Sequence, residues 1–175
     1  MNILDKIKPW ASEGETINVI VEIQKGSKNK YEFDKDTGLI KLDRVMFTGQ
    51  DYPFDYGFIP NTLWHDGDPI DVVLLTTYPL LPGILVEARP LAMMDMIDSG
   101  EGDVKIIAVP TSDPRWKDVK DLGDINAHTL KEIEHFFTSY KALQNKVCTI
   151  EGVHDKAKAI EAINESIELF EKKKQ

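Results

Sequence analysis

The order of the apolar patterns along the chain constrains its fold more than any other feature. Short β-rich segments occupy the first two thirds of the sequence, and two segments with helical periodicity occupy the last third. Segregated strands and helices favour an α+β fold over alternating βαβ units, and many short strands without an obvious edge favour a barrel. No linker, repeat or low-complexity tract interrupts the 175 residues, so we expect one domain, residues 1–175.

The strands are identified by β-branched and aromatic residues between turn-forming residues. They are expected at residues 16–23, 30–33, 39–42, 70–76, 84–96, 104–109 and 146–151. Asp34–Gly38 has turn composition, which makes 30–33 and 39–42 a hairpin, and Pro90 should break the long strand. Tyr52–Asn61 contains two prolines and a glycine, and we expect a defined but irregular loop there.

Two amphipathic helices should cover this β structure. Leu130, Ile133, Phe137 and Tyr140 recur at helical spacing in the first helical segment. The last segment has the same periodicity and begins after Asp155, a residue type that is favoured as a helix N-cap.

Asp66-Gly-Asp68-Pro-Ile-Asp71 places three carboxylates within six residues, directly before an apolar run at 72–75. Carboxylates held this close repel one another unless one is protonated or a hard cation lies among them. Magnesium prefers oxygen ligands and commonly bridges carboxylates to a phosphate-bearing substrate. An ordinary solvated acidic turn is the alternative, whereas an EF-hand does not fit, because Thr77 stands where its closing Glu should be.

A second acidic group, Asp98-Ser-Gly-Glu101-Gly-Asp103, stands directly before the expected strand 104–109. If the strands that follow the two groups are neighbours in one sheet, their leading loops open at the same rim. Carboxylates that are distant in the sequence would then bind two or more cations together, and such ions can activate water and bind a phosphoryl group.

Net charge limits the partners. Lys and Arg number 21 and Asp and Glu 30, which gives a net charge of −9. Such a surface repels nucleic acid and anionic lipid, so we expect neither as a partner. An anionic substrate should therefore arrive with its charge partly masked by a divalent cation.

The single cysteine, Cys148, allows no internal disulfide, which suggests a reducing compartment, and a buried apolar role is the favoured interpretation of it. Residues 1–10 lack the apolar core of a signal peptide, and no run of about twenty apolar residues could span a bilayer. We expect a cytoplasmic protein.

Several further residues are ambiguous when taken singly. Glu22 interrupts an apolar strand, and an outward-facing carboxylate is the simpler interpretation. Arg44, Lys105 and Lys141 are compatible with surface charge, and Tyr140 with core packing.

Taken together and in order, these groups resemble the soluble family I inorganic pyrophosphatases of the bacterial type. The resemblance is carried by Glu22, Lys30-Tyr-Glu32, Asp43-Arg44, Tyr52-Pro-x-x-Tyr56-Gly, Asp66-Gly-Asp-Pro-x-Asp71, Asp98 to Lys105 and Tyr140-Lys141. It implies a five-stranded OB-like closed β-barrel with flanking helices. It also implies magnesium-dependent hydrolysis of inorganic pyrophosphate to two orthophosphates, by direct attack of a metal-activated water.

The resemblance also implies a role for each residue. The expected catalytic residues are Asp68, Glu32 and Tyr56. Asp68 would be the general base, Glu32 would support the metal and water network, and Tyr56 would lie close to the phosphate-binding groups. The expected phosphate-binding residues are Lys30, Arg44, Tyr56, Lys105, Tyr140 and Lys141. The expected metal ligands are Asp66, Asp71 and Asp103 for the tighter magnesium ions, and Asp98 and Glu22 for further, substrate-associated ones.

Pyrophosphate would bind as its magnesium complex, and the short bacterial relatives imply a homohexamer. Such relatives often carry two histidines on the helix before the Tyr-Lys pair, whereas here His135 is present and Ser139 takes the second place. Two other functions stay open at this point. One is a non-catalytic OB-type binding module, which the acidic balance disfavours. The other is hydrolysis of a different diphosphate, such as a nucleotide.

Overall fold

The computed structural model describes residues 3–174; the remaining residues of the expected domain, 1, 2 and 175, lie outside the described part. The strands are β1 (Trp10–Ser12), β2 (Thr16–Ile23), β3 (Asn29–Asp34), β4 (Leu39–Val45), β5 (Asp55–Phe58), β6 (Asp71–Leu74), β7 (Leu85–Asp98), β8 (Glu101–Pro110) and β9 (Cys148–His154). The helices are α1 (Ala127–Ser139) and α2 (Lys156–Lys174), with 3-10 turns η1 (Ile3–Lys6), η2 (Pro114–Trp116), η3 (Leu122–Asp124) and η4 (Ala142–Gln144).

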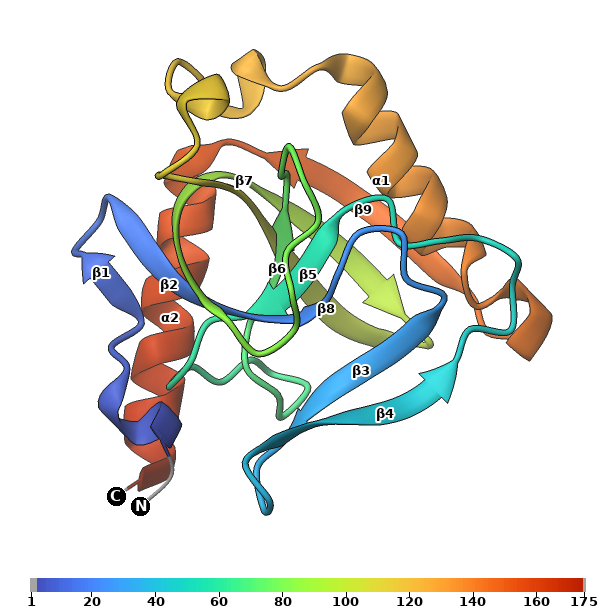
Figure 1. Ribbon diagram of the computed structural model, residues 1–175, viewed down its shortest axis with the longest axis horizontal. Coiled ribbons are helices and arrows are strands. Elements are labelled where there is room, and N and C mark those ends of the chain that lie inside the picture. The colour runs from blue at the N-terminus through green and yellow to red at the C-terminus, as the bar shows by residue number, and fades with distance from the viewer. Residues whose placement is uncertain (1–2, 175) are drawn as a thin grey trace.

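Five strands form a closed ring in the order β2-β5-β6-β8-β7, because β7 also pairs with β2. Only the β6–β8 pair of this ring is parallel. β1 and β9 extend the sheet, and the β3–β4 hairpin forms a separate two-stranded sheet beside the ring (Figure 1). The predicted α+β fold with a five-stranded barrel and flanking helices is confirmed.

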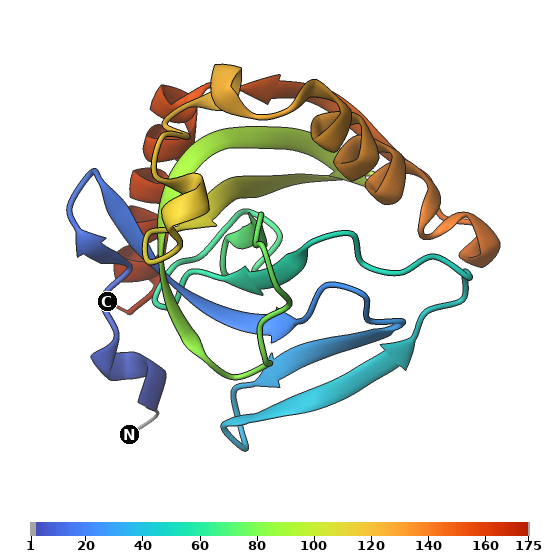
Figure 2. The ribbon, with the colours of Figure 1, turned by 45° about the horizontal axis from the view of Figure 1, so that its top comes forward.

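The two helices lie outside the ring and cover different parts of it (Figure 2). One buried cluster joins Val73 and Ile107 to Phe136 and Phe137 of α1. A second cluster joins other barrel residues, among them Val72, to α2. Neighbouring residues of β6 therefore point into different cores, which explains why this strand is apolar without alternation.

The expected strands and helices are present, with boundaries that shift by a few residues. β7 carries a register irregularity between Pro90 and Ala92, where a break was predicted. The Asp155 carboxylate accepts a hydrogen bond from the Lys158 N–H at 3.1 Å, as expected of the N-cap of α2.

The interpretation of Tyr52–Asn61 as wholly irregular is wrong, because its central residues form β5 and pair with β2 and β6. The residues of β5 lie between the two prolines, so their N–H groups are free to donate to the ladder. Gly57 makes the pairing possible: a Cβ at this position would lie 1.9 Å from the Ile20 carbonyl oxygen. Among residues 3–174, no helix is long and apolar enough to cross a membrane.

Candidate active site

The two acidic groups meet at one rim of the barrel, as predicted. β6 and β8 run parallel and side by side, with Asp71 opposite Lys105, so the loops that precede these strands open in the same direction. A cavity of about 470 Å³ lies at this rim. Its charged lining consists of seven carboxylates, Glu22, Glu32, Asp66, Asp68, Asp71, Asp98 and Asp103, and four lysines, Lys30, Lys35, Lys105 and Lys141.

Lys105 occupies the middle of the acidic rim and is only 4% exposed. Its Nζ lies 2.5 Å from Asp71 Oδ2 and 2.6 Å from Asp103 Oδ2, and the Tyr56 hydroxyl donates to Asp71 Oδ2 at 2.6 Å. Burial lowers the pKa of the Lys105 ammonium, but Asp71 and Asp103 outweigh it and raise that pKa above its usual value. Burial, together with the charge of Asp71, raises the pKa of Tyr56 well above its usual value. Both groups therefore remain hydrogen-bond donors at neutral pH.

Asp98, the last residue of β7, forms a second ion pair across the cavity, with Lys141. Its other oxygen, Oδ1, accepts from the Ser99 hydroxyl at 2.8 Å and from the Cys148 thiol at 3.3 Å. Burial raises the pKa of Asp98, but the hydrogen bonds from Lys141 and Ser99 outweigh it and lower that pKa. Burial raises the pKa of Cys148 to about 11, so the thiol stays protonated and able to donate.

Glu22 projects from β2 into the cavity and is 9% exposed, which corrects the interpretation of an outward-facing carboxylate. The β3–β4 hairpin covers it, and the Phe33 N–H donates to Glu22 Oε1 at 2.6 Å. Burial raises the pKa of Glu22 to about 8, and the nearby Asp71 adds to the shift, while the Phe33 N–H opposes it. Glu22 therefore holds a proton at neutral pH unless a cation comes close.

Lys30 and Glu32 form an ion pair on β3, and Lys30 Nζ also lies 3.5 Å from Asp43 on β4. Arg44 donates to the same Asp43 at 2.6 Å. Arg44 does not belong to the cavity lining, unlike the other twelve predicted site residues. Asp43 is thus a residue to which the sequence assigned no role and which links two expected phosphate-binding cations.

The loop before β6 presents Asp66 and Asp68 differently. Asp66 Oδ1 accepts from the backbone N–H of Asp68 at 3.0 Å, and Gly67 between them has a φ of 92°, which favours glycine. Burial and the charge of Asp71 raise the pKa of Asp66, against the effect of the Asp68 N–H. The Asp68 side chain is 76% exposed and lies 3.7 Å from Lys35. Its carboxylate is consequently accessible to a bound water.

Tyr140 forms part of both the core and the cavity wall. Its ring stacks on Phe136 with centroids 5.1 Å apart, and it also lines the cavity. Burial, with Asp98 nearby, raises the pKa of the phenol, so its hydroxyl remains protonated. Core packing and contact with a ligand are thus compatible here.

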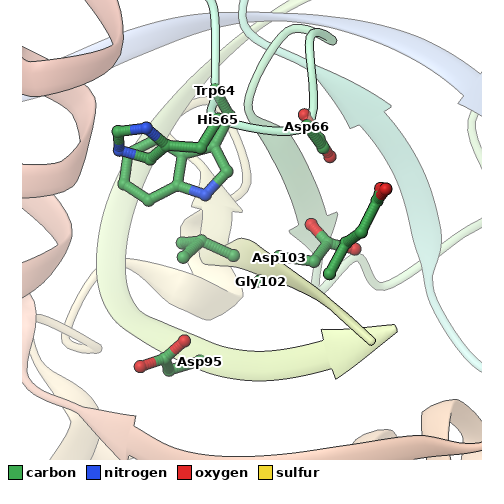
Figure 3. A pocket seen from close by; sticks show the side chains of 8 residues that line it. Trp64, His65, Asp66, Asp95, Gly102 and Asp103 are labelled. Carbon is green, nitrogen blue, oxygen red and sulfur yellow. The ribbon is translucent and has the colours of Figure 1, made fainter. Parts of the chain in front are cut away.

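A second hollow of about 520 Å³ adjoins the first and shares Asp66 and Asp103 with it. Figure 3 shows these two carboxylates together with Trp64, His65 and Asp95 around this hollow. All the predicted site residues except Arg44 line the first cavity, so we place the candidate active site there.

The chemistry of the donor set fits divalent cations. Seven carboxylates against four lysines leave a formal excess of three negative charges in the cavity. Burial, together with the charge of Asp71, raises the pKa of Asp103 against the opposing charge of Lys105. Within residues 3–174 no three His, Cys, Asp or Glu side chains converge on one point. Asp71, Asp98 and Asp103 instead face lysines. A cation that binds these carboxylates therefore competes with the lysine ammonium groups for their oxygens.

A closed barrel whose rim gathers carboxylates and lysines around one cavity is typical of enzymes that act on phosphate compounds with divalent cations. The model of the inorganic pyrophosphatase family matches residues 19–171. The inorganic pyrophosphatase of Synechocystis sp. is 48% identical over 162 residues, which cover 93% of this chain and 96% of the relative. The inorganic pyrophosphatase of Leifsonia xyli subsp. xyli is 53% identical over 143 residues, which cover 81% of this chain and 88% of the relative.

The crystal structure of the inorganic pyrophosphatase from Thermus thermophilus superimposes with a TM-score of 0.92 at 42% identity, covering 96% of this chain and 98% of that one. The chain belongs to the inorganic pyrophosphatase family, and so to the hydrolases that cleave a diphosphate.

Proposed function

We propose that this protein hydrolyses inorganic pyrophosphate to two orthophosphates in a magnesium-dependent reaction, with Asp68 as the general base. The observation that carries the proposal is the gathering of both acidic groups and four lysines in one cavity. Family membership supports the substrate. The excess of carboxylates supports the need for divalent cations.

The cationic and hydroxyl groups of the cavity bind the phosphates. Lys30, Lys105 and Lys141 line it from β3, β8 and the end of α1, so they can approach a diphosphate from different sides. Each lysine is paired with a carboxylate, which holds it in position until phosphate oxygens compete for it. Tyr56 and Tyr140 supply protonated hydroxyls, and Arg44 lies next to Lys30 in the β3–β4 register.

Asp68 takes one proton from the attacking water as its oxygen bonds to one phosphorus in line with the bridging oxygen. The bond from that phosphorus to the bridging oxygen breaks, and the second phosphate leaves. Asp68 suits this role because its exposed carboxylate lies at the mouth of the cavity, while Glu32 supports the water network nearby. No covalent enzyme intermediate is needed.

The residues proposed to hold magnesium are Asp66, Asp71, Asp103, Asp98 and Glu22. The bound ions would lower the pKa of a water and neutralise phosphate charge. Pyrophosphate arrives as its magnesium complex, which lets an anion approach a protein of net charge −9.

The protein acts in the cytoplasm as a homohexamer. Exposed apolar side chains support assembly, since exposed apolar groups of this size favour contact with another chain. They are Val45 at the end of β4, Phe47 just after it, and Tyr78 and Leu81 before β7. Sedimentation analysis would test the assembly, and a stable monomer at micromolar concentration would contradict it.

The decisive experiment mixes metal-free protein with pyrophosphate, adds magnesium, and follows the release of orthophosphate. Release should begin only with the metal. Asp68→Asn should lower kcat by at least about a hundredfold with an unchanged unfolding midpoint, because an amide cannot accept the proton of the water. A well-folded Asp68→Asn variant with wild-type turnover would exclude Asp68 as the base, and a wild-type protein without magnesium-dependent release would refute the proposed function itself.

A further inference from the structure

The Asp98 carboxylate, at the end of β7, has three side-chain partners. Its Oδ2 pairs with Lys141, and its Oδ1 accepts from both the Ser99 hydroxyl and the Cys148 thiol. The two oxygens therefore have different partners. A half-turn of the carboxylate group only exchanges its two oxygens between the same partners. Rotation about the Cα–Cβ bond, in contrast, breaks all three interactions at once.

The backbone places these partners around Asp98. β9 pairs with β7 so that Cys148 lies directly opposite Asp98 in the register. Ser99, at the turn into β8, adopts a φ of 55°, and its N–H donates to the Val147 carbonyl at 3.0 Å. This backbone conformation is unfavourable for a serine and is maintained here by contact with the start of β9. The turn and the strand therefore fix Asp98 together.

We propose that Cys148 is a positioning residue, whose thiol acts with the Ser99 hydroxyl to hold Asp98 so that its second oxygen faces Lys141 across the active-site cavity. The inference rests on the proposed function, because it concerns the same cavity. It revises the interpretation of Cys148 as only a small apolar core residue. Cys148 is only 4% exposed, so its thiol donates with little competition from water, whereas Ser99 lies nearer the surface.

Three variants separate positioning from packing. Cys148→Ala removes the donor and a little volume. Cys148→Ser keeps a donor of nearly the same size. Ile150→Val removes a similar volume two residues along β9, where Ile150 packs against the same buried cluster but lies opposite Met96 in the register instead of Asp98. Cys148→Ala should lower kcat/KM for magnesium pyrophosphate about fivefold, the effect of losing one modest hydrogen bond to a charged group. Cys148→Ser and Ile150→Val should stay within about twofold of the wild type.

A double-mutant cycle with Asp98→Ala, which removes the acceptor oxygens, shows whether Cys148 acts through Asp98. In that background Cys148→Ala should cause no further loss of kcat/KM. A fivefold loss that persists in the Asp98→Ala background, or an equal loss in Ile150→Val, would overturn the proposal in favour of a packing role.

Metal-free protein provides a readout that does not depend on catalysis. In 15N NMR, the Lys141 ammonium signal should be visible in the wild type and in Cys148→Ser, because its ion pair slows proton exchange, and weakened in Cys148→Ala. An unchanged Lys141 signal in Cys148→Ala would refute the positioning role even in a protein that hydrolyses pyrophosphate. If the wild type does not hydrolyse pyrophosphate but the signal responds as expected, the proposed function fails and the positioning role stands.

Discussion

The protonated Glu22 makes the stability of the metal-free protein depend on pH in a direction opposite to ordinary acid denaturation. The pKa of this carboxyl is about 8 in the folded protein, against 4.5 for the exposed group. Between these two values the folded protein keeps a proton that the unfolded chain releases. The contribution of Glu22 to stability is therefore complete below pH 4.5, decreases as the pH rises, and is lost above pH 8.

The magnitude follows from the size of this shift. A shift from 4.5 to about 8 corresponds to about 5 kcal/mol, since each pKa unit is worth about 1.4 kcal/mol. This value is an upper limit, because outward movement of the β3–β4 hairpin would admit water to the carboxylate. Even about 2 kcal/mol is a large part of the stability of a typical domain. Glu22→Gln should abolish this contribution, because Gln keeps an oxygen that can accept from the Phe33 N–H but does not titrate.

Urea unfolding at pH 5 and at pH 8.5, with a chelator present, measures the effect. The unfolding free energy of the wild type should fall by about 2 to 4 kcal/mol more over this interval than that of Glu22→Gln, because pH 5 already lies above 4.5. Glu32→Gln is the matched control, because Glu32 lines the same cavity but its side chain is 53% exposed. Its pH dependence should follow that of the wild type. Equal slopes for Glu22→Gln and the wild type would show that Glu22 is ionised in the folded protein and would refute the reasoning.

Two further predictions concern the barrel and the cavity. Gly57→Ala should lower the free energy of unfolding in urea by at least about 3 kcal/mol, because the new Cβ would lie 1.9 Å from the Ile20 carbonyl oxygen. Gly123→Ala is the control: a Cβ there would meet no atom within 4 Å, so the free energy of unfolding should change by less than about 0.5 kcal/mol. Equal effects would refute the strand-contact argument. Lys141→Ala should raise the KM for magnesium pyrophosphate about tenfold, because it removes a cation of the cavity and the ion pair of Asp98. Lys146→Ala, at an exposed position, should leave the KM unchanged. An unchanged KM in Lys141→Ala would exclude Lys141 from substrate binding.

The parts of the fold that depend on local pattern could be predicted from the sequence. β2 begins and ends as expected, the β3–β4 hairpin follows its turn composition, and Asp155 caps α2. The meeting of the two acidic groups could also be predicted, because it requires only that the strands after them be neighbours. The parallel pairing of β6 with β8 provides that arrangement.

The burial and the orientation of the acidic side chains could not be predicted, because both depend on contacts between segments that are distant in the sequence. Alternation along β2 cannot show that the β3–β4 hairpin covers Glu22, and the register of β2 is irregular between Val21 and Ile23. Asp55 is the opposite of Glu22, since its carboxylate does not line the cavity. It lies in the same Tyr-rich stretch as Tyr56, yet its carboxylate accepts from the backbone N–H groups of Lys25 and Leu80 and has a structural role. Composition alone does not distinguish these two acids.

The barrel provides a physical reason why so many like charges can share one cavity. Parallel β6 and β8 bring Asp71 and Asp103 to the same rim, and Lys105, two residues after Asp103, lies between them because alternate residues share one face of a strand. The lysine offsets the repulsion while the protein folds, yet the excess of carboxylates keeps the cavity attractive to cations. Replacing Lys105 with Met should therefore harm folding of the metal-free protein more than that of the magnesium-loaded protein. The residue that we propose to bind phosphate thus also makes the acidic rim tolerable without metal.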